Sequence, residues 1–302
     1  MNKVKFLSCS FLSLSLVFAI ASCNSKPDNL IVIGSKNFTE QRILGELLAQ
    51  KIESNTNLKV ERRFDLGGTF VCHQAITAGK IDTYVEYTGT AFTAILKNEP
   101  INDADKVYQK VKRDYEQSFN ITWLPPLGFN NTFAMIIRGE DSRKLKVNTI
   151  SQAAKFAPSW RAGFGYEFTE RKDGLPGLSQ TYGLRFEQTP KVMDLGLMYR
   201  ALKENQVDIV AGNSTDGVID RFDLVVLKDD RLFFPPYQAA PVIRQEVLQK
   251  HPELQQALSQ LAGVLSDREM RNLNYQVDGE GKNVKQVVQS FLQSKGLVKN
   301  QK

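Results

Sequence analysis

Few side chains in this sequence have the types and the spacing that catalysis or metal binding requires. The two histidines, His73 and His251, stand far apart, and neither belongs to a metal-ligand spacing. Residues 212–217 (GNSTDG) are similar to a nucleophile turn but hold one residue too many for the G-x-S-x-G pattern. A P-loop and a G-x-G-x-x-G motif are also absent from the sequence. The sequence therefore predicts no enzyme, no metal site and no cofactor, and an esterase built around Ser214 is kept only as an alternative.

The segment 85–90 (VEYTGT) offers a different chemistry, because it places an aromatic ring at the end of a predicted strand. Strand alternation puts Tyr87 and Val85 on one face and Tyr84 and Glu86 on the other. Ligand sites in α/β proteins favour the carboxyl ends of strands. From these residues alone, Tyr87 is expected either to pack its ring in a core or to form a wall of a cleft.

Hydrophobic patterns in the first part of the chain predict an α/β protein. The apolar run 30–34 ends in a glycine and is typical of a buried parallel strand. Two more strands are expected at 60–64 and 83–87, with a helix starting at Thr39 and another over 70–78 between them. This alternation predicts a mostly parallel sheet covered by helices.

A second α/β run begins at Phe133, and the alternation is interrupted twice, near 128–132 and near 236–240. The interruptions predict two lobes joined by two hinge crossings, with a ligand cleft between the lobes. The expected lobes are 30–130 plus 239–302 for lobe 1 and 131–238 for lobe 2. The expected strands of the second run are 133–137, 160–164, 207–210, 225–227, 232–234 and 240–243, and the expected helices are 178–182, 192–205, 252–265 and 284–295.

The N-terminal residues are typical of a secretory signal peptide. Two lysines precede the apolar run 6–21, and the small residues that follow lead directly to Cys23, as in a bacterial lipobox. We therefore expect a signal peptide over 1–22, lipidation of Cys23 and a short tether over 23–29. The protein would then lie in the periplasm or on the outer face of the cytoplasmic membrane, held by its lipid alone. An ordinary signal peptide with an incidental cysteine is the alternative.

Charge and cysteine content exclude other classes. Removal of Lys3 and Lys5 with the signal peptide leaves 37 of the 39 basic residues against 33 acidic ones, and their interspersed order is not that of a nucleic-acid-binding protein. Processing and lipidation would leave Cys72 as the one free thiol, so no intrachain disulfide is expected.

Seven short segments share an order and spacing that extend over residues 30–298. They are 33–41 (IGSKNFTEQ), 66–69 (LGGT), 85–90 (VEYTGT), 129–132 (FNNT), 167–174 (EFTERKDG), 214–217 (STDG) and 236–241 (PYQAAP). Together they resemble the osmoprotectant (glycine betaine/choline) substrate-binding proteins of ABC transporters. The resemblance implies a two-lobed type II periplasmic-binding-protein fold, which captures a quaternary ammonium compound and delivers it to a permease with an ATPase.

The resemblance also implies roles for individual residues. Tyr87 and Tyr237 correspond to walls of an aromatic cage, where cation–π attraction to a trimethylammonium group is worth roughly 0.5–2 kcal/mol for each desolvated ring. Thr90 corresponds to a further ligand contact. Lys36 and Arg171 correspond to residues that bind the carboxylate end of the ligand. If they lie in opposite lobes, a bound carboxylate would draw the cleft shut.

The sequence departs from the family pattern at two positions. Asn213 stands where an aromatic residue is frequent, and Leu127 stands where a tyrosine is expected. Phe129, Tyr166 or Phe164 is the expected substitute in the cage. Asn213 would add hydrogen-bonding capacity that suits a larger betaine such as ergothioneine. Besides the hydrolase, the alternatives are the same fold binding ergothioneine or an amino acid, and a regulatory sensor lobe.

Overall fold

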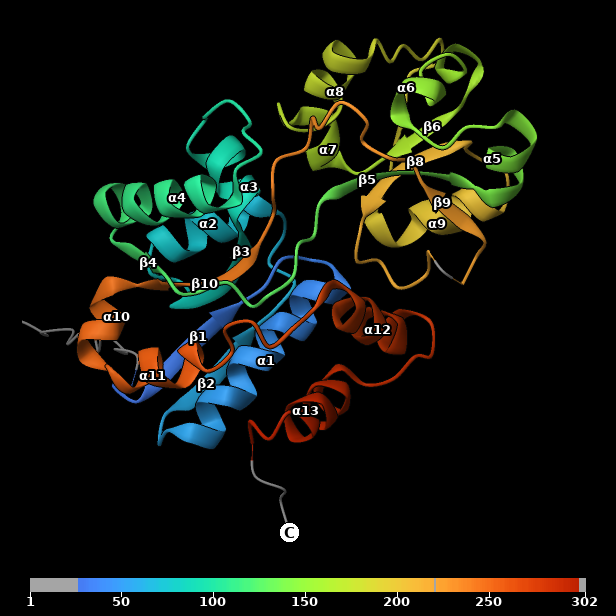
Figure 1. The fold of residues 1–302 in the computed structure, drawn as a ribbon. Helices are drawn as coiled ribbons and strands as arrows, with labels where there is room; N and C mark the ends of the chain where they lie inside the picture. Colours follow the sequence, from blue (N-terminus) through green and yellow to red (C-terminus); the bar gives the residue numbers. More distant parts are fainter. Residues whose placement is uncertain (1–26, 220, 299–302) are drawn as a thin grey trace, which may run out of the picture.

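The structure is a computed structural model that describes residues 27–219 and 221–298. The predicted signal peptide and Cys23 lie outside the described residues, as does most of the predicted tether. Within the described residues the chain forms two five-stranded sheets, in the strand orders β2-β1-β3-β10-β4 and β7-β6-β8-β5-β9. Figure 1 shows that each sheet is covered by its own helices and that two extended segments join the two lobes.

The first lobe is built on β1 (Leu30–Gly34), whose side chains alternate between two hydrophobic cores. Ile31 and Ile33 pack against α1 and the C-terminal helices, and Val32 packs on the other face against α2 and α4. The remaining elements of this lobe are α1 (Thr39–Asn55), β2 (Lys59–Arg63), α2 (Thr69–Thr77), β3 (Thr83–Tyr87), α3 (Thr88–Thr90), the π-helical turn η1 (Ala91–Ile95), α4 (Ala104–Phe119), β4 (Ile121–Trp123), β10 (Ala239–Arg244), α10 (Gln245–Lys250), α11 (Glu253–Ser259), α12 (Asp267–Asp278) and α13 (Val284–Ser294).

The second lobe follows the same plan around β5 (Phe133–Arg138). Met135 and Ile137 pack in one core with α6 and α8, and Ile136 packs in another core with α9. The remaining elements are α5 (Gly139–Leu145), α6 (Ile150–Ala153), the 3-10 turn η2 (Ala157–Ser159), β6 (Ala162–Phe164), α7 (Tyr166–Glu170), α8 (Leu175–Tyr182), β7 (Lys191–Val192), α9 (Leu195–Lys203), β8 (Ile209–Asn213) and β9 (Leu224–Val226). None of the described helices combines the length and the apolar composition needed to cross a membrane.

The expectation of a mostly parallel sheet holds for strand direction, but one strand of each sheet runs against the other four. In the described part of the chain, β10 is antiparallel to both β3 and β4, and β5 is antiparallel to both β8 and β9. Each of these strands directly follows a crossing, so it enters its sheet from the side of the other lobe. The N-terminal strands β1, β2 and β3 are parallel, as predicted.

Several other elements differ from the sequence expectation. Residues 232–234 form no strand, and the helix expected over 252–265 is the shorter α11, after which α12 forms separately. The helix α4 was not predicted, although Asp103 caps its start by accepting a hydrogen bond from the backbone N–H of Lys106. The buried positions Val107, Val111 and Tyr115 recur at helical spacing along it.

The two crossings, 124–132 and 227–238, run side by side. The backbone N–H of Asn131 donates to the carbonyl of Tyr237 at 3.0 Å, and the backbone N–H of Tyr237 donates to Asn130 Oδ1 at 2.6 Å. Because the crossings are bonded to each other, the lobes are connected by a paired hinge rather than by two independent linkers (Figure 1).

Gly128 provides a test of the first crossing. Its φ of +112° and the carbonyl of Leu265, 2.5 Å from where a Cβ would lie, both require glycine. We expect Gly128→Ala to lower the free energy of unfolding by the backbone strain plus an overpacking cost of about 1–3 kcal/mol, measured by urea denaturation. The control is Gly183→Ala, where φ is +68° and no atom lies within 4 Å. Its expected cost is the left-handed backbone penalty alone, about 1–2 kcal/mol, and equal losses in the two variants would contradict the close packing at the crossing.

Candidate functional site

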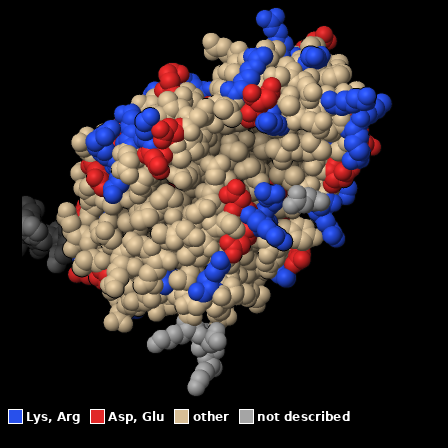
Figure 2. Space-filling view, in the orientation of Figure 1, with Lys and Arg blue, Asp and Glu red and all other residues tan. Residues whose placement is uncertain are grey.

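A cavity of about 660 Å³ lies between the two lobes. The first lobe contributes the loop after β1, the start of α2 and the end of β3, and the second lobe contributes α7 and the residues around 192–195. On the face seen in Figure 2, the hollow between the lobes is bordered mainly by uncharged side chains. The aromatic residues that line the cavity are Phe38, Phe70, Tyr87, Phe133, Tyr166, Phe168 and Tyr237.

The structure brings most of the sequence-predicted ligand residues to this cavity. The predicted residues that line it are Lys36, Tyr87, Thr90, Arg171, Asn213 and Tyr237. Phe129 is not among them and packs in the core of the first lobe, whereas Tyr87 and Tyr237 belong to the same core and also line the cavity. Phe164 is likewise buried in the core of the second lobe, whereas Tyr166 lines the cavity with 68% of its surface exposed.

Lys36 lies in the loop after β1 and is nearly fully buried. Its Nζ contacts Glu86 Oε1 at 2.6 Å and Thr69 Oγ1 at 2.9 Å. The ammonium group also lies 5.2 Å from the centre of the Tyr87 ring. Glu86 is held in turn by the hydroxyl of Tyr84 and by the backbone N–H of Tyr87. The charge of Lys36 is therefore balanced within its own lobe and fixed in position.

Arg171 follows α7 and provides the cation of the second lobe. Its Nε donates to Asp173 Oδ1 at 2.9 Å, and its Nη2 contacts Asp173 Oδ2 and, at 3.3 Å, Thr90 Oγ1 of the first lobe. The guanidinium carbon lies 5.0 Å from the centre of the Phe133 ring. Burial works to raise the pKa of Asp173, but the charge of Arg171 and the hydrogen bonds from Arg171 and Tyr237 together outweigh it and leave that pKa below its ordinary value.

Tyr237 reaches the cavity from the second crossing. Its hydroxyl donates to Asp173 Oδ2 at 2.6 Å, and its ring lies edge-on to Phe133 with the ring centres 5.9 Å apart. The ring also closes on Gly89, since a Cβ there would lie 2.7 Å from both the ring and the carbonyl of Pro236. Glycine at this position therefore allows the crossing to approach the end of β3.

Glu40 in the first turn of α1 was not predicted as a site residue, yet its carboxylate fixes the Tyr87 ring. It accepts hydrogen bonds from the hydroxyl of Tyr87 at 2.7 Å, Asn131 Nδ2 at 2.7 Å, the hydroxyl of Thr215 at 2.5 Å and Asn274 Nδ2 at 3.0 Å. Burial raises the pKa of Glu40, and the four donors partly offset this. This one carboxylate connects the first lobe, the first crossing, the second lobe and α12.

Asn213 is held by Asp216, which lies in the turn after β8. The carboxylate accepts a hydrogen bond from the backbone N–H of Asn213 at 2.9 Å and another from the hydroxyl of Tyr199. Burial raises the pKa of Asp216 to about 6, while these donors act in the opposite direction. Asp216 thus shapes the cavity through Asn213 and does not line it.

Other lining residues were missed at the level of sequence. Thr69 and Glu167 lie within segments that carry the family resemblance, but no role was assigned to them. Phe70 and Val71 are 46% and 47% exposed at the mouth of the cavity, and Val192 of the second lobe is 57% exposed. One sequence feature could have identified Phe70 and Val71 as lining residues. They are apolar residues at the start of a helix, but they lie away from the positions that α2 buries.

The residues considered for catalysis have structural contacts instead. Ser214 Oγ accepts a hydrogen bond from the backbone N–H of Thr132 at 3.1 Å and so supports the first crossing. His73 packs edge-on against Tyr115 and Phe119. Among the described residues, no group of three or more His, Cys, Asp or Glu side chains has a metal-binding arrangement.

Comparisons with known proteins agree with this geometry. Residues 29–294 match the family model described as the substrate binding domain of ABC-type glycine betaine transport systems. A carnitine transport binding protein of Listeria monocytogenes is 39% identical over 299 residues, covering 96% of this chain and 97% of that protein. An ergothioneine transport permease/ergothioneine binding protein of Helicobacter pylori is 36% identical over 288 residues, covering 95% of this chain and 51% of that protein.

The solved structure of a glycine betaine/carnitine/choline ABC transporter protein is similar with a TM-score of 0.73 and 34% sequence identity. The match covers 88% of this chain and 99% of that one. Two α/β lobes with a cavity between them define the class of periplasmic binding proteins, which confirms the predicted fold class. The chain belongs to the family of substrate-binding domains of ABC-type glycine betaine transport systems. It is therefore a transport protein, and the alternative of a hydrolase is wrong.

Asp216 gives a testable dependence of stability on pH. Its pKa in the folded protein is about 6, against an ordinary value of 3.8, so the folded state holds the proton more tightly than the unfolded state. The stability that it contributes is fully present below about pH 4 and is lost as the pH rises through about 6. We expect Asp216→Asn to lack this part of the dependence when unfolding free energies are measured by urea denaturation at several pH values.

The control for the loss of one negative charge is Asp105→Asn, at an exposed position of α4. Its curve of stability against pH should follow that of the unmodified protein. If the Asp216→Asn curve also runs parallel to it between pH 4 and 7, the carboxyl of Asp216 does not titrate in this range.

Proposed function

We propose that this protein captures a quaternary ammonium osmoprotectant in the cavity between its lobes and delivers it to the permease and ATPase subunits of an ABC importer. The observation that carries the proposal is the convergence of Tyr87, Tyr237 and Phe133 beside Lys36 and Arg171 in one cavity. Aromatic faces suit a methylated cation, and fixed basic groups suit a carboxylate.

The aromatic rings are supported from behind in a way that favours binding through their faces. The hydroxyls of Tyr87 and Tyr237 donate to the buried carboxylates Glu40 and Asp173, so each ring is held at its polar end. A trimethylammonium group has no N–H to donate and gains most from such rings when it is desolvated. Asn213 adds an amide to this cage.

The carboxylate end of a zwitterionic ligand has donors from both lobes. Lys36 Nζ and the hydroxyls of Thr69 and Thr90 come from the first lobe, and Arg171 comes from the second. A carboxylate bound between them would hold the two lobes together, which is the basis of hinge closure in binding proteins.

The first candidate ligands are glycine betaine, choline and carnitine. The alternative ligand is ergothioneine. The similarity to a carnitine-binding and to an ergothioneine-binding relative supports both choices. The cavity of about 660 Å³ is large for glycine betaine alone, and Asn213 offers a polar contact, so a larger betaine fits the same site. A free amino acid lacks the methylated cation that the rings would recognise.

The first test is calorimetric titration with glycine betaine, carnitine, choline, ergothioneine and proline. We expect binding of at least one quaternary ammonium compound and none of proline. Tyr87→Leu should weaken that ligand at least tenfold, equivalent to about 1.4 kcal/mol, because the aromatic face is lost. Tyr87→Phe is the matched control, since it loses the same hydrogen bond to Glu40 but keeps the ring. Equal affinities of the Leu and Phe variants would contradict the cage.

The proposal includes membrane attachment. Cys23 follows the small residues of the lipobox-like segment, so we infer that 1–22 is removed and Cys23 is lipidated, with 23–29 as the tether. The protein would then act in the periplasm or on the outer face of the cytoplasmic membrane.

Metabolic labelling with a radioactive fatty acid tests the anchor. The unmodified protein should be labelled and should sediment with membranes, and Cys23→Ala should lose both properties. Cys9→Ala, which changes another cysteine of the same segment, should leave both unchanged. Labelling of the Cys23→Ala protein would rule out this attachment site.

A further inference from the structure

We propose that Glu167 occupies the anion-binding position of the cavity, so that the carboxylate of a zwitterionic ligand must displace it, and that Glu167 thereby sets the preference between zwitterionic and purely cationic quaternary ammonium ligands. The inference rests on the proposed function of the cavity. It adds a specificity-determining residue from the second lobe.

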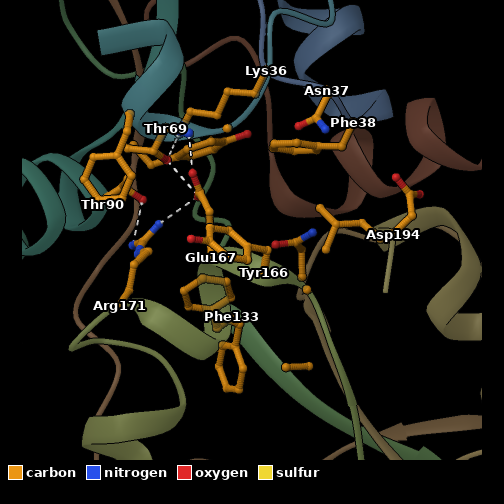
Figure 3. A pocket seen from close by; sticks show the side chains of 18 of the residues that line it. Lys36, Asn37, Phe38, Thr69, Thr90, Phe133, Tyr166, Glu167, Arg171 and Asp194 are labelled. Carbon is orange, nitrogen blue, oxygen red and sulfur yellow. Dashed lines mark hydrogen bonds and ion pairs between the residues drawn. The ribbon is translucent and has the colours of Figure 1, made fainter. Parts of the chain in front are cut away.

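The contacts of Glu167 are those expected of a bound carboxylate. Its Oε1 accepts a hydrogen bond from the backbone N–H of Thr69, and its Oε2 accepts one from the hydroxyl of the same residue at 3.0 Å. Oε2 also lies 3.6 Å from Arg171 Nη1. Figure 3 shows the carboxylate between Thr69 of the first lobe and Arg171 of the second. One side chain thus bridges the lobes in the way proposed for the ligand.

The surroundings of this carboxylate are built for an anion. Thr69 is the first residue of α2, where backbone N–H groups and the helix dipole favour negative charge. Gly68 allows the close approach, since a Cβ at this position would lie 2.2 Å from Glu167 Oε1. The hydroxyl of Thr69 also accepts a hydrogen bond from Lys36 Nζ at 2.9 Å. This hydroxyl therefore connects Glu167 to the ammonium group of Lys36.

The charge balance explains why Glu167 would compete with a ligand. Lys36 and Arg171 are each paired with a carboxylate of their own lobe, Glu86 and Asp173. Glu167 lines the cavity, as does Asp194, and its negative charge comes in addition to these two pairs. A ligand carboxylate placed on the same donors would be repelled by it unless Glu167 moved away.

Glu167 has room to move, because its side chain is 28% exposed at the cavity whereas Arg171 is only 4% exposed. A zwitterion would replace the Glu167 carboxylate with its own. Choline has no carboxylate, so it would leave Glu167 in place and gain from its negative charge. Removal of the charge should therefore favour zwitterions and disfavour choline.

The test measures the dissociation constants of choline and glycine betaine for the unmodified protein, Glu167→Ala and Glu167→Gln by calorimetric titration. We expect the ratio of the choline constant to the glycine betaine constant to rise at least fivefold in Glu167→Ala and to rise in the same direction in Glu167→Gln. The control, Glu170→Ala, removes an exposed charge of the same helix and should leave the ratio unchanged.

Glu167→Gln keeps the size of the side chain and serves if the alanine variant does not fold, as checked by circular dichroism. If the dissociation constants of both ligands rise by the same factor, Glu167 only holds the two lobes together, and the inference is overturned. An unchanged ratio overturns it as well. If the unmodified protein binds neither these ligands nor carnitine or ergothioneine, the proposed function itself fails, and the inference fails with it.

Discussion

The site depends on the burial of two cations, Lys36 and Arg171, whose side chains are each only 4% exposed. Removal of one partner of a buried ion pair typically costs about 3–5 kcal/mol, so each cation needs a carboxylate that stays in place. Glu86 and Asp173 meet this need from within the same lobe as their partners. The strong pairs therefore survive any movement of one lobe against the other. The contacts across the cavity are the hydrogen bond that Arg171 donates to the hydroxyl of Thr90 and the two that Glu167 accepts from Thr69, and a ligand can replace them.

Buried carboxyl groups also hold the aromatic walls of the cavity in position. Tyr87 and Tyr237 are each bonded through their hydroxyls to a buried acid, so neither side chain can swing out of the cavity wall without breaking a hydrogen bond to a buried carboxyl group. The Glu40 carboxylate does more than hold a ring, because it also bonds the first crossing through Asn131 and the second lobe through Thr215. The position of the cage wall and the geometry of the hinge are thus fixed by one group. Such support from behind is what a preorganised binding site requires.

The sequence was most informative where a strand or helix imposes a period. The alternation along 83–87 predicted Tyr87 and Val85 on one face and Tyr84 on the other, and in the structure the two faces pack in separate cores. Periodicity is silent about the direction in which a strand enters a sheet, so the antiparallel β5 and β10 were missed. Hydrophobic periodicity also gives no information about the irregular crossings, so it could not predict that Phe129 packs in the core. Glu40 could not be found because four of its partners come from distant parts of the chain.

The insertion of β10 between β3 and β4 has a consequence for the order in which the two sheets can form. The second sheet is made entirely of strands between Phe133 and Val226, so it can assemble as soon as that contiguous stretch has emerged. The first sheet must wait, because β4 at Ile121–Trp123 gains its neighbour only when Ala239–Arg244 is made. Its early strands meanwhile keep an unpaired edge, and their late, long-range pairing makes completion of the N-terminal half the slow step of folding.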